Sequence, residues 1–143
     1  MKKLATLLAA GVLAALVVSS IALAGKSASW SAPLTSGQEI PKQVVKDAAA
    51  KGQFTATLSG SKLKWKLTFS GLTGPATAAH IHLAAMGKSG NVVVPLCGPC
   101  KSGQTGTATV PAAVKTAFGK GLLYVNVHTA KNAAGEIRGQ LGG

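Results

Sequence analysis

The sequence predicts an all-β domain, a Greek-key antiparallel β-sandwich or barrel with one short helix. Several short segments alternate hydrophobic and polar residues, which is the period of a half-buried strand. Clusters of Gly, Pro, Asn and Ser separate these segments at the short spacing that is typical of sandwiches and barrels. Only residues 111–118 have helical character, with Pro111 at their start and Gly119 after their end.

The clearest alternation predicts a hairpin of residues 53–58 and 62–69, with its turn at 59–61. On the second strand Trp65 and Phe69 belong to the face that is expected in the core, and lysines occupy the solvent face. Residues 38–51 are expected to form a loop with room for one turn of helix. The other predicted strands are residues 29–34, 77–84, 91–96, 103–110, 122–129 and 135–141.

The N-terminus has the pattern of a signal peptide over residues 1–24. Two lysines precede an apolar run over residues 4–18, and Ala22-Leu23-Ala24 forms an A-x-A cleavage site. Cleavage would leave a single domain, residues 25–143, that is periplasmic or extracellular, with 119 residues and a formal charge of +10. The mature form contains no second apolar stretch of ~20 residues, so no transmembrane span is expected there. The alternative is an uncleaved leader that acts as an anchor.

The chain is basic and contains very few acids. Against 15 Lys and Arg residues, Glu39, Asp47 and Glu136 are the only carboxylate side chains. This composition disfavours chemistry that needs a carboxylate pair and calcium sites built from several acids. The positive charge favours an anionic surface polymer or lipid as a partner, and the alternative is a basic secreted protein with scattered lysines. Nucleic acid is not expected, because of the export signal and the few aromatic residues.

Three histidines are placed where they can meet. Residues two apart on a strand share a face, so His80 and His82 point the same way. On the strand of residues 122–129, His128 shares its face with Tyr124 and Asn126, opposite the aliphatic residues. The pattern places all three imidazoles on the outer wall, where they can bind one metal ion, copper or alternatively zinc. The alternative interpretation is three unconnected histidines.

The two cysteines, Cys97 and Cys100, lie three residues apart with Gly98 and Pro99 between them. In an oxidising compartment a disulfide is expected. A redox-active Cys-x-x-Cys motif needs a helix N-terminus to lower the pKa of its first thiol. The residues after Cys100 indicate a loop and a strand instead, which favours a structural bridge over a redox or metal role.

Six segments in fixed order resemble the CHRD domain, a module named for its repeats in chordin and frequent in secreted bacterial proteins. The resemblance covers residues 29–142, and the last two segments are the most specific. It implies an extracellular module, which in chordin-like proteins is associated with growth-factor antagonism. The segments are residues 34–41 (LTSGQEIP), 78–83 (AAHIHL), 90–96 (GNVVVPL), 106–111 (GTATVP), 123–129 (LYVNVHT) and 135–141 (GEIRGQL).

The histidine strands are also distantly similar to Cu/Zn superoxide dismutases. Those enzymes carry a strand His-x-His, a later Val-His and a Gly-x-Arg segment on a Greek-key barrel. By that resemblance His80, His82 and His128 match three copper ligands, while the bridging histidine and the zinc cluster have no counterpart. Arg138 would then lie near the metal and attract an anion, or else pair with Glu136 or a backbone carbonyl. The resemblance implies a mononuclear site at most.

These observations lead to a secreted or periplasmic CHRD-domain protein that binds one copper ion for storage, delivery or scavenging. Tyr124, Asn126 and Arg138 are the candidates to support the three ligands. The first alternative is a metal-free module that binds an envelope or extracellular protein. The third hypothesis is a superoxide dismutase-like enzyme, which ranks last because the sequence lacks the bridging histidine.

Overall fold

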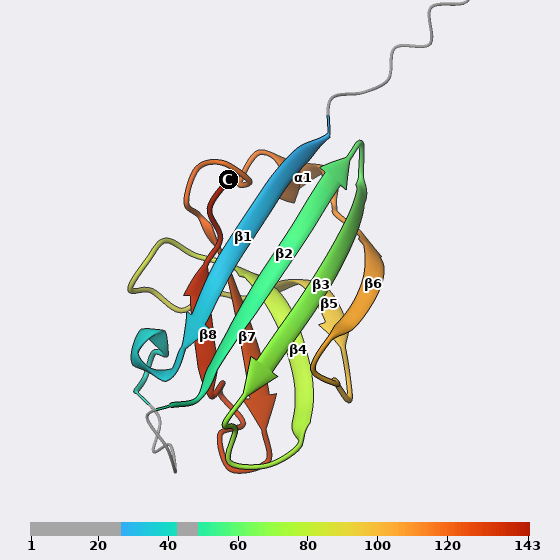
Figure 1. Ribbon diagram of the computed structural model, residues 1–143. Coiled ribbons are helices and arrows are strands. Elements are labelled where there is room, and N and C mark those ends of the chain that lie inside the picture. The colour runs from blue at the N-terminus through green and yellow to red at the C-terminus, as the bar shows by residue number, and fades with distance from the viewer. Residues whose placement is uncertain (1–26, 43–48) are drawn as a thin grey trace, which may run out of the picture.

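The computed structural model describes residues 27–42 and 49–143 of the 143-residue chain (Figure 1). The predicted signal peptide, residues 1–24, lies outside the described residues, as do Asp47 and the rest of residues 43–48. The described part of the chain is almost entirely β-structure, which confirms the predicted fold class.

Eight strands form in the described residues, close to the predicted segments. The alternation of apolar and polar residues accounts for them, because it gives each strand one face for the core and one for the opposite side. The strands are β1 (Ala28–Thr35), β2 (Lys51–Ser59), β3 (Lys62–Ser70), β4 (Ala76–Leu83), β5 (Val92–Cys97), β6 (Gln104–Thr109), β7 (Leu123–Thr129) and β8 (Ile137–Gln140).

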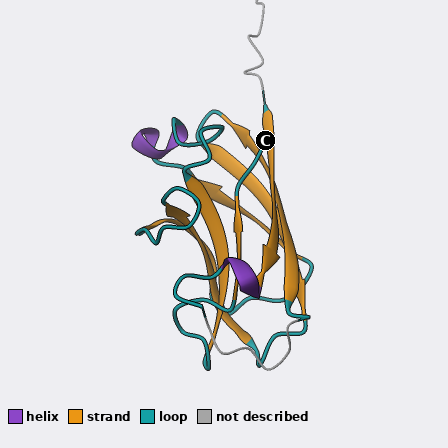
Figure 2. Ribbon diagram, turned by 90° about the vertical axis from the view of Figure 1, so that its left-hand side faces the viewer, coloured by secondary structure: helices purple, strands orange, loops and turns teal. Residues whose placement is uncertain are grey.

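The strands pair in the order β5-β4-β7-β8-β1-β2-β3-β6, and all of the pairs are antiparallel. β3 pairs with β6 and β4 pairs with β7, so each pair skips two strands in sequence, which is the Greek-key arrangement. The end strands β5 and β6 also contact each other, so the sheet nearly closes into a barrel. Figures 1 and 2 show its two halves lying face to face.

The hydrophobic core fills the space between the two halves. Phe54 of β2 and Leu67 of β3 face Ile81 of β4 and Val125 of β7 as members of one buried cluster. Trp65 lies over Gly106, its direct partner on β6, and a Cβ at position 106 would collide with the indole ring. The Trp65 indole therefore packs closely on the β6 backbone because position 106 has no side chain.

The helix is shorter than predicted. α1 covers Ala112–Lys115 rather than residues 111–118. After Lys115 the backbone hydrogen bonds join residues three apart, as in Phe118 N to Lys115 O, so the chain continues as tight turns. A 3-10 turn, η1 (Ser36–Gln38), follows β1. Among the described residues, no helix is both long and apolar enough to span a bilayer.

Candidate metal centre

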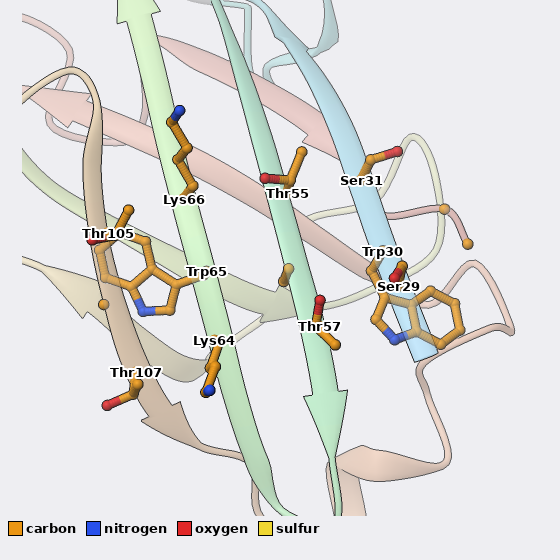
Figure 3. A pocket seen from close by; sticks show the side chains of 14 residues that line it. Ser29, Trp30, Ser31, Thr55, Thr57, Lys64, Trp65, Lys66, Thr105 and Thr107 are labelled. Carbon is orange, nitrogen blue, oxygen red and sulfur yellow. The ribbon is translucent and has the colours of Figure 1, made fainter. Parts of the chain in front are cut away.

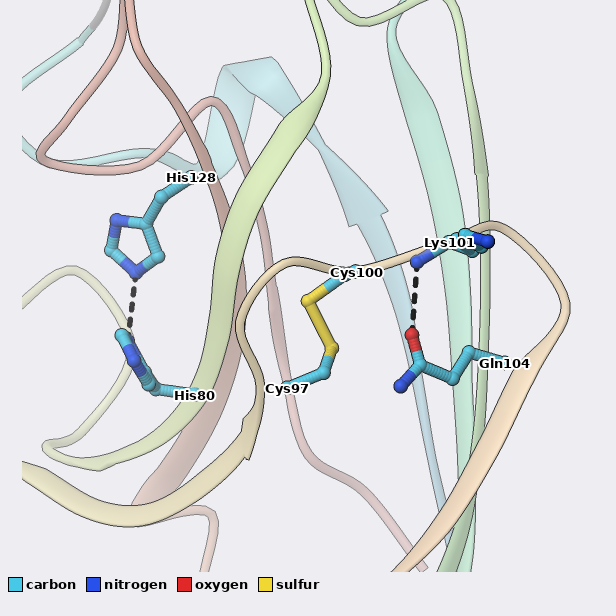
Figure 4. The surroundings of a disulfide bond; sticks show 6 residues. All are labelled: His80, Cys97, Cys100, Lys101, Gln104 and His128. Carbon is cyan, nitrogen blue, oxygen red and sulfur yellow. Dashed lines mark hydrogen bonds between the residues drawn. A yellow bond between two sulfur atoms is a disulfide. The ribbon is translucent and has the colours of Figure 1, made fainter.

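The three histidines meet on the face of β4 and β7 that points away from the core. In the register of these strands His80 lies opposite Asn126, and His128 lies opposite Ala78. His80 Nδ1 is 3.0 Å from His128 Nε2 (Figure 4). One ring nitrogen from each of His80, His82 and His128 lies within 4.8 Å of the other two. We call these three residues the histidine cluster.

Backbone carbonyls fix the orientation of two of the rings. His82 Nδ1 is 2.9 Å from the Gly90 carbonyl, and His128 Nδ1 is 2.9 Å from the Ala133 carbonyl. A carbonyl only accepts, so Nδ1 of each ring carries the hydrogen and Nε2 keeps its lone pair. This outer hydrogen bond is the usual support of a metal-bound histidine.

The chemistry of this donor set fits a metal ion that prefers nitrogen. His82 Nε2 is buried and has no hydrogen-bond partner among the described residues. His128 Nε2 accepts the hydrogen of His80 Nδ1, so these two ring nitrogens already face each other across one shared hydrogen. A cation bound to the three rings would replace that hydrogen, with His80 carrying its hydrogen on Nε2 instead. The histidine cluster therefore offers three neutral imidazoles to an ion such as copper or zinc.

The surroundings keep these imidazoles uncharged. Burial, and then the neighbouring His128 and His82, lowers the pKa of His80 to about 4. Burial also lowers the pKa values of His82 and His128, although the hydrogen bonds to Gly90 and Ala133 oppose the shift. Neutral imidazole is the form that binds a metal, so protons compete weakly at neutral pH.

Tyr124 and Arg138 extend the site as a stack. The Tyr124 ring lies parallel to His82, with 4.7 Å between ring centroids and an interplanar angle of 8°. The Arg138 guanidinium carbon lies 3.4 Å from the Tyr124 ring centroid, which is a cation–π contact. Arg138 Nη2 donates to the Lys88 carbonyl at 2.7 Å, so the expected carbonyl partner is present. The stack holds the His82 ring in place from one side.

Pairing between Arg138 and Glu136 does not occur. Glu136 is fully buried and accepts hydrogen bonds from Thr73, Thr129 and Asn132. These bonds together lower the pKa of the Glu136 carboxyl, against the opposing effect of burial. Glu136 precedes β8 and bonds to Thr73, Thr129 and Asn132, whereas Arg138 lies within β8 and contacts Tyr124 and the Lys88 carbonyl.

The histidine face is partly covered: His82 is buried, while His80 and His128 are half-buried, which differs from a fully open outer wall. The chain between β4 and β5 lies over it: Gln140 Nε2 donates to the Ala84 carbonyl, and Gly90 N donates to the Tyr124 hydroxyl. As a result His82 is only 8 % exposed and Asn126 only 2 %. Sequence periodicity assigns faces correctly here, but it contains no information on which loop folds over a face.

Asn126 and Glu39 form a buried polar layer beside the cluster. Asn126 Nδ2 donates to the Ala134 carbonyl, while its Oδ1 has no partner among the described residues. Glu39, which the sequence did not single out, is 2 % exposed. Burial raises the pKa of its carboxyl to about 7, although the nearby Arg138 opposes the shift. Only the scarcity of acids could have drawn attention to Glu39.

The expected disulfide joins Cys97 and Cys100, with 5.3 Å between their Cα atoms (Figure 4). Cys97 ends β5, and the segment after Cys100 leads by a turn into β6 rather than into a helix. The amide of Cys100 donates to the Ala76 carbonyl, so the bridged turn is attached to β4. A disulfide of this kind fits an oxidising compartment.

The fold and the cluster define a small Greek-key β-domain with a three-histidine centre under its loops. The family profile of the CHRD domain matches residues 30–141, so the chain belongs to the CHRD domain family. Comparisons with curated proteins and with solved structures give no match. The likeness to Cu/Zn superoxide dismutases therefore stays a resemblance of motifs. CHRD membership indicates a module of the extracellular type, as the disulfide also does.

Proposed function

We propose that this CHRD domain binds one copper ion through His80, His82 and His128, outside the cytoplasm, for storage, delivery or scavenging. The carrying observation is the pair of Nδ1 bonds to the Gly90 and Ala133 carbonyls. These bonds leave two Nε2 lone pairs directed into the cluster. Because the outer bonds are already made, binding needs little reorganisation of the two rings.

The three imidazole ligands favour copper over other ions. Three imidazoles suit copper and zinc, and divalent copper is bound more tightly than zinc by a given set of nitrogen ligands. The carboxyl of Glu39 does not belong to the cluster of candidate ligands, and the two cysteines are joined to each other. When bound, copper would supply an open coordination position and one-electron chemistry. The residues of this chain hold, orient and partly cover it.

Titration of the purified protein with Cu(II), followed by calorimetry and by electron paramagnetic resonance, tests this proposal. We expect one ion per chain and hyperfine coupling to nitrogen. The double variant His80→Ala/His128→Ala should weaken binding by about a hundredfold or more, as loss of two of three ligands requires. Gln53→Ala, on the opposite half of the barrel, serves as the control and should leave affinity unchanged.

Two results would contradict the proposal: no one-to-one complex, or equal affinity in the double variant and the wild type. Competition between Cu(II) and Zn(II) on the same protein decides the metal, and tighter binding of zinc would replace copper in the assignment. A superoxide turnover assay on the copper-loaded protein tests the enzymatic alternative. We expect no turnover, because the sequence lacks the bridging histidine.

A further inference from the structure

The outer face of β1, β2, β3 and β6 carries two cross-strand rows of the same composition. The strand register places one residue from each strand directly beside the next. The first row reads Ser29, Thr57, Lys64 and Thr107. The second row reads Ser31, Thr55, Lys66 and Thr105. Each row therefore presents Ser, Thr, Lys and Thr in the same order across the sheet.

A groove runs between the two rows (Figure 3). The residues between the rows are Trp30, Ala56, Trp65 and Gly106, and these belong to the core side of the sheet. The hydroxyl and lysine side chains stand along the two sides of the groove, these four residues line it between the rows, and Gly142 and Gly143 line it beside β1. The groove has a volume of about 810 Å³. Its walls stand ~7 Å apart and extend over three strand spacings, ~14 Å.

The lysines on this face have no acidic side chain beside them in the described residues. Lys64 and Lys66 are exposed, and Lys51 and Lys62 stand on the same face. Of the carboxylates in the described residues, Glu39 and Glu136 are both buried on the other half of the barrel. No carboxylate side chain of the described residues is therefore available on this face, and the four lysines favour an anionic partner.

The walls also restrict the class of partner. Hydroxyl groups both donate and accept hydrogen bonds, as the hydroxyl groups of sugars do. Ammonium groups pair with carboxylate or sulfate. Trp65 is buried and Trp30 is half-buried with its ring against Phe118, so neither offers a fully exposed aromatic platform for stacking nucleic-acid bases. The face also lacks the apolar side chains with which a protein enters a lipid interface.

We propose that this groove binds an acidic polysaccharide, a sugar chain that carries carboxylate or sulfate groups. The chain lies across the strands, its acidic groups beside Lys64 and Lys66 and its hydroxyl groups against the threonines of β2 and β6. This site is separate from the histidine cluster, which lies on β4 and β7. Binding is therefore independent of copper.

Binding of fluorescently labelled alginate and heparin to the purified protein, with a chelator present, tests the proposal. We expect both polymers to bind and neutral dextran not to bind. The variant Lys64→Gln/Lys66→Gln should weaken binding by about tenfold or more. Lys88→Gln/Lys131→Gln removes the same charge from exposed loops on the other half of the barrel and should weaken binding by less than about threefold, through long-range attraction alone.

A second variant tests the hydroxyl groups. Thr57→Val/Thr107→Val keeps the shape and strand preference of the side chains but removes two wall hydroxyls. We expect a loss of about threefold to tenfold in alginate affinity, with the salt dependence unchanged because no charge is removed. Thermal denaturation of each variant verifies that its fold is intact, since all the substituted side chains point away from the core.

Three results would overturn the proposal. Equal losses in the two lysine double variants would indicate diffuse charge rather than a site. Unchanged alginate affinity in the threonine variant would show that the threonine hydroxyl groups do not contact the sugar. Duplex DNA or phosphatidylglycerol vesicles binding as tightly as alginate would assign the groove to another class of partner. Failure of copper binding would leave the proposal unaffected, because the chelator excludes the metal from the experiment.

Discussion

Glu39 and Glu136 show how the surroundings of a residue decide its chemistry. Both carboxyls are buried, yet Glu136 accepts bonds from three side chains and one backbone amide, while Glu39 Oε1 has no partner among the described residues. The pKa of Glu136 is accordingly lowered and that of Glu39 is raised to about 7. Hydrogen bonds compensate the burial of charge in one case and not in the other.

The raised pKa of Glu39 predicts that the contribution of this one group to stability decreases as pH rises. Between pH 4.5 and about pH 7 the folded chain binds more protons at this group than the unfolded chain. The contribution of Glu39 to the free energy of unfolding therefore falls across this window, by up to roughly 3 kcal/mol at 1.36 kcal/mol per pK unit, while the lowered pKa values of the histidines act in the opposite direction. Glu39→Gln should remove this loss, because glutamine does not titrate. The free energy of unfolding of the variant should therefore increase relative to that of the wild type as pH rises.

Urea denaturation of both proteins at pH 4.5, 6 and 8 measures this effect. The difference in free energy of unfolding should widen toward pH 8. A difference that stays constant between pH 4.5 and 8 would show that Glu39 does not titrate in this range.

At the scale of elements, the pairing of β3 with β6 depends on a matched pair of side chains. Trp65 is buried against the backbone of Gly106, where a Cβ would meet its ring at a distance shorter than real contacts. The indole is rigid, and the core beyond it is closely packed. The contact between Trp65 and Gly106 therefore favours the pairing of β3 with β6 in this register.

Gly106→Ala should destabilise the fold by about 1–3 kcal/mol, the usual cost of overpacking in a core. Gly74→Ala is the control, because a Cβ at position 74 meets nothing within 4 Å. Its effect should stay within about 0.5 kcal/mol. Chemical denaturation measures both variants, and equal effects would contradict the packing role of Gly106.

At the scale of the whole molecule, the histidine cluster joins segments that are distant in sequence. Gly90 lies between β4 and β5, and Ala133 lies between β7 and β8, and their carbonyls orient rings on β4 and β7. A bound ion would therefore connect two loops and two strands. Ligand binding to the folded state alone stabilises that state.

Saturating Cu(II) should accordingly raise the melting temperature by several degrees, since a concentration of 100 times Kd supplies about 2.7 kcal/mol. A chelator should return the melting temperature to its metal-free value. Differential scanning calorimetry measures both, and His80→Ala/His128→Ala should show no shift. An equal shift in that variant would place the stabilising ion elsewhere.

Local sequence patterns are enough to predict the strands and their faces. Periodicity of two places His80 and His82 together and Trp65 in the core, because side chains alternate along a strand regardless of what surrounds it. The limits of β8 and α1 were less accurate, since element ends depend on hydrogen bonds with other segments. The cysteine spacing and the family segments were equally local signals.

The neighbours of each strand and the loops that cover each face are seen in the folded structure and not in these local patterns. The register of β4 with β7 brings His128 beside His80, and the loop carbonyl of Gly90 sets the ring of His82. The burial of Glu39 and the groove across β3 arise in the same way. These features join residues far apart in the chain, and local sequence patterns carry no information on such contacts.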